Sequence, residues 1–143
     1  MRTMKKLIML IGFAMLVAAC GNNQTSESKT SENETSEYGI AKVEVFYFHA
    51  TRRCPTCNKI EDISKDFVAQ QYKDQDVKYY SVNFEDSQNK EITQKYSITW
   101  SSLIISSGDE HEDITDLAFQ VINSDPSQLT NRMQNLIDEY LSK

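Results

Sequence analysis

The most informative stretch of the chain reads Phe48-His49-Ala50-Thr51-Arg52-Arg53-Cys54-Pro55-Thr56-Cys57. It follows residues 43–48, an apolar run of β-branched and aromatic side chains that is typical of a buried strand. It precedes residues 54–72, whose apolar side chains recur at helical spacing. Two cysteines separated by two residues therefore lie where a strand ends and a helix begins, a spacing that allows a disulfide between them.

The position of Cys54 at the start of a helix has chemical consequences. Free N–H groups and the positive end of the helix dipole point at this residue and stabilise a thiolate. The pKa of the Cys54 thiol is therefore expected to fall, which makes it the attacking sulfur, and Cys57 would resolve the mixed disulfide. Three roles are open for Arg52 and Arg53. They lower that pKa further, they bind an anionic substrate, or they are solvated charges of the loop.

Two other roles for the cysteine pair stay open. A stabilising disulfide is one, although a loop this short restricts the unfolded chain little. The other is a site in which Cys54 and Cys57 bind a soft metal or metalloid ion.

The stretch resembles the thioredoxin-type active site, with Phe48-His49-Ala50 in place of the family's Phe-Trp-Ala and one extra residue before the first cysteine. Residues 82–110 follow the order of the second half of thioredoxin, so the resemblance covers residues 41–141. More narrowly, the stretch is similar to small exported bacterial thioredoxin-like lipoproteins, some named as nitrophenyl-compound nitroreductase subunits or as thiol-redox components of aromatic-arsenical efflux systems. The resemblance implies a thioredoxin-like α/β fold, a redox-active Cys54–Cys57 dithiol and no cofactor.

The chain departs from the thioredoxin pattern at two places. Tyr47 stands where thioredoxins carry a buried aspartate that accepts a proton. Whether Glu44, three residues earlier, replaces that proton acceptor stays open. Ser101 and Ser102 stand where thioredoxins carry a cis-proline that shapes the substrate groove. These departures favour a specialised partner, or a metal or metalloid held by the dithiol, over general protein-disulfide reduction.

Two further residues are candidates for the site. His49 shuttles a proton or ligates a metal, or it is a packed and hydrogen-bonded histidine at the strand end, which we favour. Trp100 forms a wall of the site or packs in the core.

The first residues predict a lipoprotein signal peptide. Residues 1–19 have a basic start and an apolar run too short for a comfortable membrane span. They end in Leu16-Val17-Ala18-Ala19-Cys20-Gly21, which resembles the bacterial lipobox, so Cys20 is the predicted lipidation site. Ordinary signal cleavage nearby and an uncleaved anchor are the alternatives. Lipid chains on Cys20 would anchor the protein stably, in a compartment where disulfides persist.

Composition divides the remainder into two parts. Residues 20–39 comprise the lipidated cysteine and a polar segment that we expect to be a disordered tether, and residues 40–143 form one domain. Removal of residues 1–19, with three basic and no acidic side chains, leaves 12 basic against 21 acidic residues, a net charge of −9. That charge argues against nucleic acid as a partner.

The pattern of the domain predicts the order β-α-β-α-β-β-α of a minimal thioredoxin fold, a central four-stranded mixed sheet flanked by helices. Beyond the first strand and helix, we expect strands at 77–84, 100–106 and 112–117, a helix at 87–96, a turn at 107–109 and a last helix that begins at Pro126.

Together these observations predict a membrane-anchored, extracytoplasmic thiol:disulfide oxidoreductase. Its expected substrate is an exported protein or a small-molecule disulfide. The family resemblance also implies a membrane thiol transporter of the cytochrome-c-biogenesis type as electron partner. The alternatives are a thiol-based metal or metalloid binding lipoprotein for an efflux or assembly system, and a scaffold module with a structural disulfide.

Overall fold

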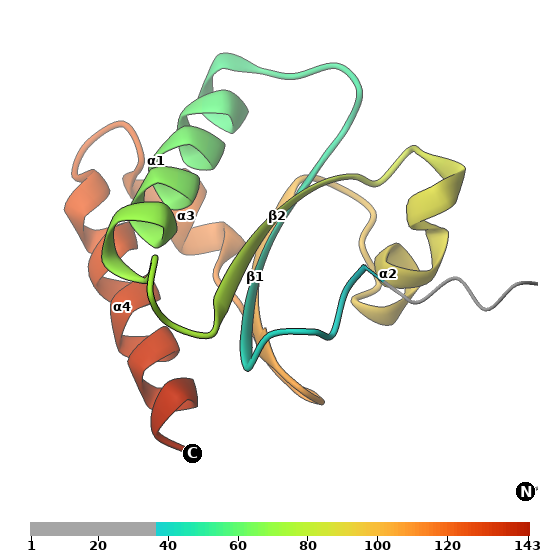
Figure 1. Ribbon diagram of the computed structural model, residues 1–143. Coiled ribbons are helices and arrows are strands. Elements are labelled where there is room, and N and C mark those ends of the chain that lie inside the picture. The colour runs from blue at the N-terminus through green and yellow to red at the C-terminus, as the bar shows by residue number, and fades with distance from the viewer. Residues whose placement is uncertain (1–36) are drawn as a thin grey trace, which may run out of the picture. The chain divides into compact units, whose positions relative to one another are not determined.

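The structure is a computed structural model that describes residues 37–143. Its strands and helices run in the order shown in Figure 1. They are β1 (Val43–His49), α1 (Pro55–Gln71), β2 (Val77–Asn83), the 3-10 helix η1 (Ser87–Asn89), α2 (Lys90–Lys95), β3 (Ser102–Ser107), β4 (Glu110–Asp113), α3 (Thr115–Val121) and α4 (Pro126–Ser142).

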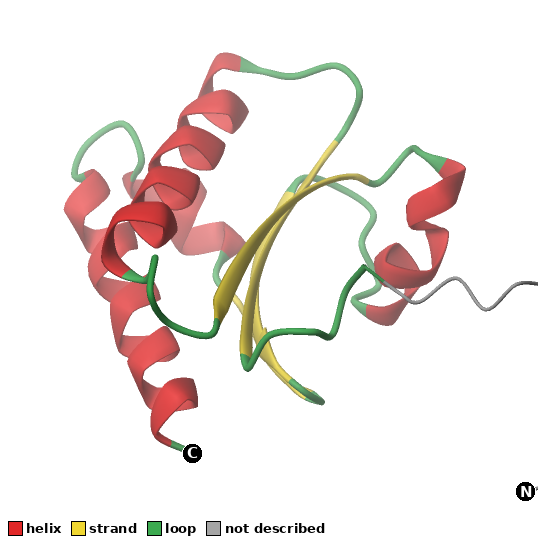
Figure 2. Ribbon diagram, viewed as in Figure 1, coloured by secondary structure: helices red, strands yellow, loops and turns green. Residues whose placement is uncertain are grey.

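The four strands form one mixed sheet in the order β2-β1-β3-β4. β1 pairs in parallel with β2 and antiparallel with β3, and β3 pairs antiparallel with β4. Helices α1, α3 and α4 lie on one side of the sheet and α2 lies on the other (Figure 2). The central strand β1 is therefore covered on both faces, and its end carries the loop that leads to the two cysteines.

Alternation along β1 divides the core into two clusters. Val43, Val45 and Tyr47 are fully buried against the α1, α3 and α4 side. Phe46 and Phe48 point to the other face, where they pack in a smaller, more aromatic cluster with residues of α2. Because successive side chains of a strand alternate between faces, this one strand contributes to both clusters.

Most predicted elements are confirmed, with small shifts at their ends. Helix α1 has Cys54 as its N-cap and Pro55 in its first turn. Helix α4 begins at Pro126, and the Asp125 carboxylate accepts a hydrogen bond from the Ser127 N–H at 3.2 Å. The predicted turn at 107–109 is also present, with Gly108 at a φ of 61°, a conformation that favours glycine.

The predicted fourth strand is present, but its predicted bounds of 112–117 are wrong, because β4 spans Glu110–Asp113 and helix α3 follows. The Asp113 carboxylate accepts a hydrogen bond from the Thr115 N–H at 2.9 Å, and the Thr115 hydroxyl accepts one from the Leu103 N–H at 2.8 Å. Ala118 and Ile122, spaced one helical turn apart, are fully buried. These contacts turn the chain away from the sheet and fix a short helix on its surface.

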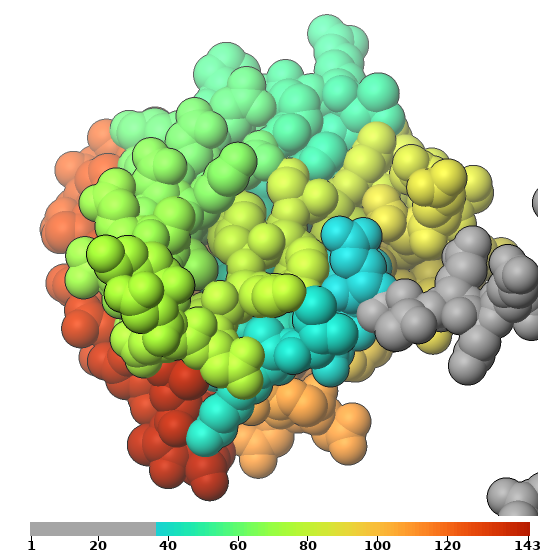
Figure 3. Space-filling model, in the orientation of Figure 1, coloured from blue at the N-terminus to red at the C-terminus, as the bar shows by residue number. Residues whose placement is uncertain are grey.

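The end of the predicted tether also belongs to the folded part of the chain. The Tyr38 ring packs edge-on against Phe46 and Tyr80, with ring centroids 5.6 and 5.1 Å away. Its hydroxyl donates to Asn89 Oδ1 at 3.1 Å. The first described residues lie beside β2 and α2 in the space-filling view (Figure 3). The tether prediction is therefore wrong for Tyr38, because the rings of Phe46 and Tyr80 on the sheet hold this side chain.

The predicted signal peptide, Cys20 and most of the predicted tether lie outside the described residues. Within residues 37–143, no helix combines the length and apolar content needed to span a membrane.

Candidate active site

The two cysteines form a disulfide at the N-terminus of α1. Their Cα atoms are 5.1 Å apart. Cys54 has extended backbone angles, and its sulfur accepts a hydrogen bond from the Cys57 N–H at 3.0 Å. The sequence produces this geometry because Pro55 suits the first turn of a helix, where its missing N–H is not needed. A thiolate at Cys54 would meet the same N–H group and the helix dipole.

The two sulfurs differ in accessibility. Cys54 is exposed, whereas Cys57 is partly buried and packs against the core cluster on the α1 side of the sheet. Incoming substrate would therefore meet Cys54 first, and Cys57 is placed to act within the molecule. The sulfur predicted to attack is thus the more exposed one, and Cys57 is only partly buried.

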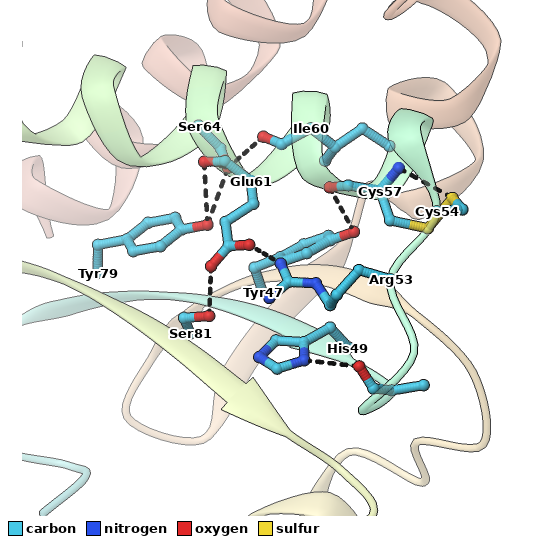
Figure 4. Close-up of polar contacts among 11 residues, drawn as sticks. Tyr47, His49, Arg53, Cys54, Cys57, Ile60, Glu61, Ser64, Tyr79 and Ser81 are labelled. Atoms are coloured by element: carbon cyan, nitrogen blue, oxygen red, sulfur yellow. Dashed lines mark hydrogen bonds and ion pairs between the residues drawn. A yellow bond between two sulfur atoms is a disulfide. The ribbon is translucent and has the colours of Figure 1, made fainter.

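Tyr47 of β1 lies beneath the dithiol. It is fully buried, and its hydroxyl donates to the Cys57 carbonyl oxygen at 2.9 Å (Figure 4). Burial raises the pKa of Tyr47 to about 12, partly offset by the nearby Arg53 cation. The phenol is therefore neutral at physiological pH and serves as a hydrogen-bond donor to the first turn of α1.

Glu44 does not take the place of the missing aspartate. Its carboxylate accepts hydrogen bonds from the backbone N–H groups of Gly39 and Ile40, at 2.7 and 3.3 Å. Those contacts lie at the start of β1, the end opposite to the cysteine loop. Glu44 therefore fixes the entry of the chain into the sheet.

The carboxylate near the dithiol is Glu61. The spacing of Glu61 and Lys65 in the sequence predicts an i,i+4 ion pair on the solvent face of this helix. The structure shows this prediction to be wrong, because Glu61 forms an ion pair with Arg53 and accepts a hydrogen bond from the Ser81 hydroxyl of β2. The Arg53 guanidinium lies 5.9 Å from the centre of the Tyr47 ring. One signal was present in the sequence: Glu61 follows Cys57 by four residues and so lies on the same face of α1.

The other two candidates near the dithiol, Arg52 in the loop and His49 at the end of β1, have different surroundings. Arg52 is exposed, with no ion pair to any residue in the described part of the chain. His49 is partly buried, its Nδ1 is 3.0 Å from the Ala50 carbonyl oxygen, and its ring centre lies 6.4 Å from that of Tyr47. This arrangement matches the packed and hydrogen-bonded histidine that we favoured.

The three candidates at the start of β3 differ in their exposure to solvent. They are Trp100, Ser101 and Ser102. Ser102 is opposite Phe48 in the sheet, so this segment lies at the end of the sheet that carries the cysteine loop. Ser102 itself is buried, and its hydroxyl donates to the Trp100 carbonyl at 3.1 Å, so it is not accessible to a substrate. Ser101 is partly exposed. Trp100 is 55% exposed and stacks on Phe119 of α3 with ring centroids 6.3 Å apart. The strand predicted at 100–106 included Trp100, but β3 begins at Ser102.

The strand order β2-β1-β3-β4, with a helix that begins at the two cysteines after the central strand, decides the fold. The fold is thioredoxin-like. No family model matches the chain, and no curated protein matches it.

Several solved structures are similar to the chain. One is a designed protein, with 21% identity over 68% of this chain and 78% of that chain and a TM-score of 0.48. Thioredoxin O2 from Arabidopsis thaliana in its oxidized state has 22% identity over 63% of this chain and 76% of that chain, with a TM-score of 0.45. Thioredoxin from Wuchereria bancrofti has 20% identity over 68% and 83%, with a TM-score of 0.42. All three TM-scores are below 0.5, so these similarities carry no conclusion about this chain.

Proposed function

We propose that this protein is a thiol:disulfide oxidoreductase in which Cys54 attacks and Cys57 resolves. One observation carries the proposal: an exposed cysteine caps a helix and forms a disulfide with a less exposed cysteine in the first turn of that helix. This arrangement gives one sulfur a low pKa and open access, and it gives the other sulfur a position from which to attack its neighbour.

The proposed reaction transfers two electrons. The Cys54 thiolate attacks one sulfur of a substrate disulfide, which forms a mixed disulfide and releases the other substrate sulfur as a thiolate. Cys57 then loses its proton and attacks the Cys54 sulfur, which breaks the mixed disulfide and releases the second substrate thiolate. The protein dithiol is oxidised to the Cys54–Cys57 disulfide, and the substrate disulfide is reduced to two thiols. In the reverse direction the protein oxidises a substrate dithiol.

We further propose that the protein works outside the cytoplasm, anchored through a lipid on Cys20. The support is the lipobox-like sequence before Cys20 and the separation of the three cysteines into one near the leader and two at the helix. Its substrate would be an exported protein or a small-molecule disulfide, and a membrane thiol transporter would supply or remove electrons. A metal or metalloid site at Cys54 and Cys57 remains an alternative prediction; within residues 37–143 no group of three or more His, Cys, Asp and Glu side chains is placed to bind a metal ion.

The test is the redox equilibrium of the full-length protein in glutathione buffers. A Cys20→Ser background leaves Cys54 and Cys57 as the only thiols, and alkylation with a mass tag after acid quenching counts the reduced form. A potential of about −270 mV would make the protein a reductant, and about −120 mV an oxidant. A protein that forms no disulfide at any glutathione ratio would contradict the proposal.

A further inference from the structure

The ion pair between Arg53 and Glu61 is the charged feature nearest to the dithiol that the proposed reaction does not yet use. Both side chains are largely shielded from water, with 25% of the Arg53 side chain and 16% of the Glu61 side chain exposed. Charges in such a place interact more strongly than charges on an open surface, since less water screens them. The pair is therefore able to influence ionisation at the neighbouring sulfurs.

The Arg53 side chain points away from the sulfur of the next residue. Arg53 directly precedes Cys54, yet its guanidinium extends beneath α1 toward Glu61, away from the disulfide (Figure 4). Within the described residues, the buried Nε and Nη2 atoms of Arg53 have no hydrogen-bond partner, and Nη2 is held by the ion pair with Glu61. Glu61 thus holds a cation that the chain sequence places beside the attacking sulfur.

We propose that Glu61 is a positioning residue that sets the acidity of the Cys54 thiol and the redox balance of the dithiol by holding the Arg53 guanidinium away from Cys54. The inference rests on the proposed function, because it concerns the same dithiol. A cation close to a thiolate stabilises it and lowers the thiol pKa, and a carboxylate that binds this cation weakens the effect. Glu61 thereby keeps the Cys54 thiol less acidic than Arg53 alone would make it.

Other titratable groups surround the pair without replacing it. Burial raises the pKa values of Tyr47 in β1 and Tyr79 in β2, so both phenols are neutral at physiological pH. Asp62 on α1 and Arg52 in the loop are exposed, where water and salt screen their charges. His49 at the end of β1 lies against Tyr47. The partly buried charges that face the first turns of α1 are therefore those of Arg53 and Glu61.

The first test replaces the carboxylate by the amide of similar shape, Glu61→Gln, in the full-length Cys20→Ser protein. The freed guanidinium approaches the Cys54 thiolate, so the thiol pKa is expected to fall by about one unit. Ultraviolet absorbance of the thiolate against pH measures this shift. The dithiol form should gain about fivefold to tenfold in the glutathione equilibrium at neutral pH, where tenfold corresponds to about 30 mV toward a more oxidising potential.

Two further variants separate positioning from a general charge effect. Asp66→Asn makes the same change of charge at an exposed site of α1 and should leave the thiol pKa unchanged. Arg53→Gln removes the cation and should raise the pKa. Glu61→Gln made in the Arg53→Gln background should shift the pKa by less than half of its effect in the parent protein, because no guanidinium is left to release.

Each outcome decides the inference. A Glu61→Gln pKa equal to that of the Asp66→Asn control, or higher than that of the parent, would overturn it. Equal shifts with and without Arg53 would also overturn it, since Glu61 would then act through its own charge. If Glu61→Gln fails to fold by circular dichroism, an unchanged pKa in Arg53→Gln would overturn the inference, and a raised pKa would support it. A parent protein that never forms the disulfide would instead refute the proposed function, so the two failures are distinguishable.

Discussion

The hydrogen bond from Tyr47 to the Cys57 carbonyl makes a sharp test of how the sheet supports the cysteine helix. Tyr47→Phe removes only the hydroxyl, and the remaining ring keeps its shape in a fully buried site. The hydrogen bond is 2.9 Å long and joins β1 to the first turn of α1. Its loss leaves the carbonyl without this donor.

The expected cost follows from the full burial of Tyr47 and the partial burial of Cys57. A typical internal hydrogen bond contributes about 1 kcal/mol net, and a buried acceptor that loses its donor costs about 1–3 kcal/mol. A carbonyl in the first turn of a helix also accepts a hydrogen bond from the N–H group four residues later. The Cys57 carbonyl therefore keeps a donor in the variant, and we expect the lower end of that range. A loss of about 1 kcal/mol would lower the midpoint of thermal unfolding by roughly 5 °C for a domain of this size.

Thermal and urea unfolding of the disulfide and dithiol forms would measure this cost. The matched control is Tyr140→Phe in α4, where the ring is 6% exposed and no hydrogen bond of its hydroxyl is seen within residues 37–143. The bond reaches a backbone carbonyl, not a sulfur, so both redox forms should lose the same stability and the glutathione equilibrium should hardly move. Equal losses for Tyr47→Phe and the control, or a clear shift of the redox equilibrium, would refute this reasoning.

Three further predictions concern the sulfurs and the tyrosines. Cys57→Ser should accumulate a mixed disulfide between Cys54 and a substrate, visible by mass spectrometry, whereas Cys54→Ser should form none; trapping by the Cys54→Ser variant instead would reverse the assigned roles. Cys20→Ser should move the protein from the membrane fraction of its cells to the soluble fraction, and retention in the membrane would contradict the lipid anchor. Stability should fall as the pH rises from about 10 to about 12, because burial raises the folded-state pKa values of Tyr47 and Tyr80 to about 12 while the unfolded chain ionises first. Urea unfolding across that range measures the slope, and a flat profile would show that these phenols do not control alkaline unfolding.

The parts of the fold that sequence reasoning predicted well are those set by local pattern. The strand before the cysteines is an unbroken apolar run, the cysteine spacing marks the start of α1, and Pro126 marks the start of α4. These signals act within a few residues, so they can be read without knowledge of the tertiary structure.

The parts that were missed depend on contacts between distant residues. Helix α3 is short and is held by the hydrogen bond from the Leu103 N–H to Thr115, which joins it to another element. Tyr38 looked like part of a polar tether because Tyr80 and Asn89, which contact its side chain, lie far along the chain. The pairing of Glu61 with Arg53 likewise requires the loop to fold back beneath α1, which spacing alone does not predict.

The strand order has a consequence for the behaviour of the protein at high concentration. Within the described chain β2 and β4 are the edges of the sheet, and such edges can pair with another chain and start aggregation. β4 has only four residues, Glu110–Asp113, and three of them are acidic. β2 carries an exposed Lys78, and exposed lysines on edge strands oppose pairing. We therefore expect the folded domains to stay separate from one another at high concentration.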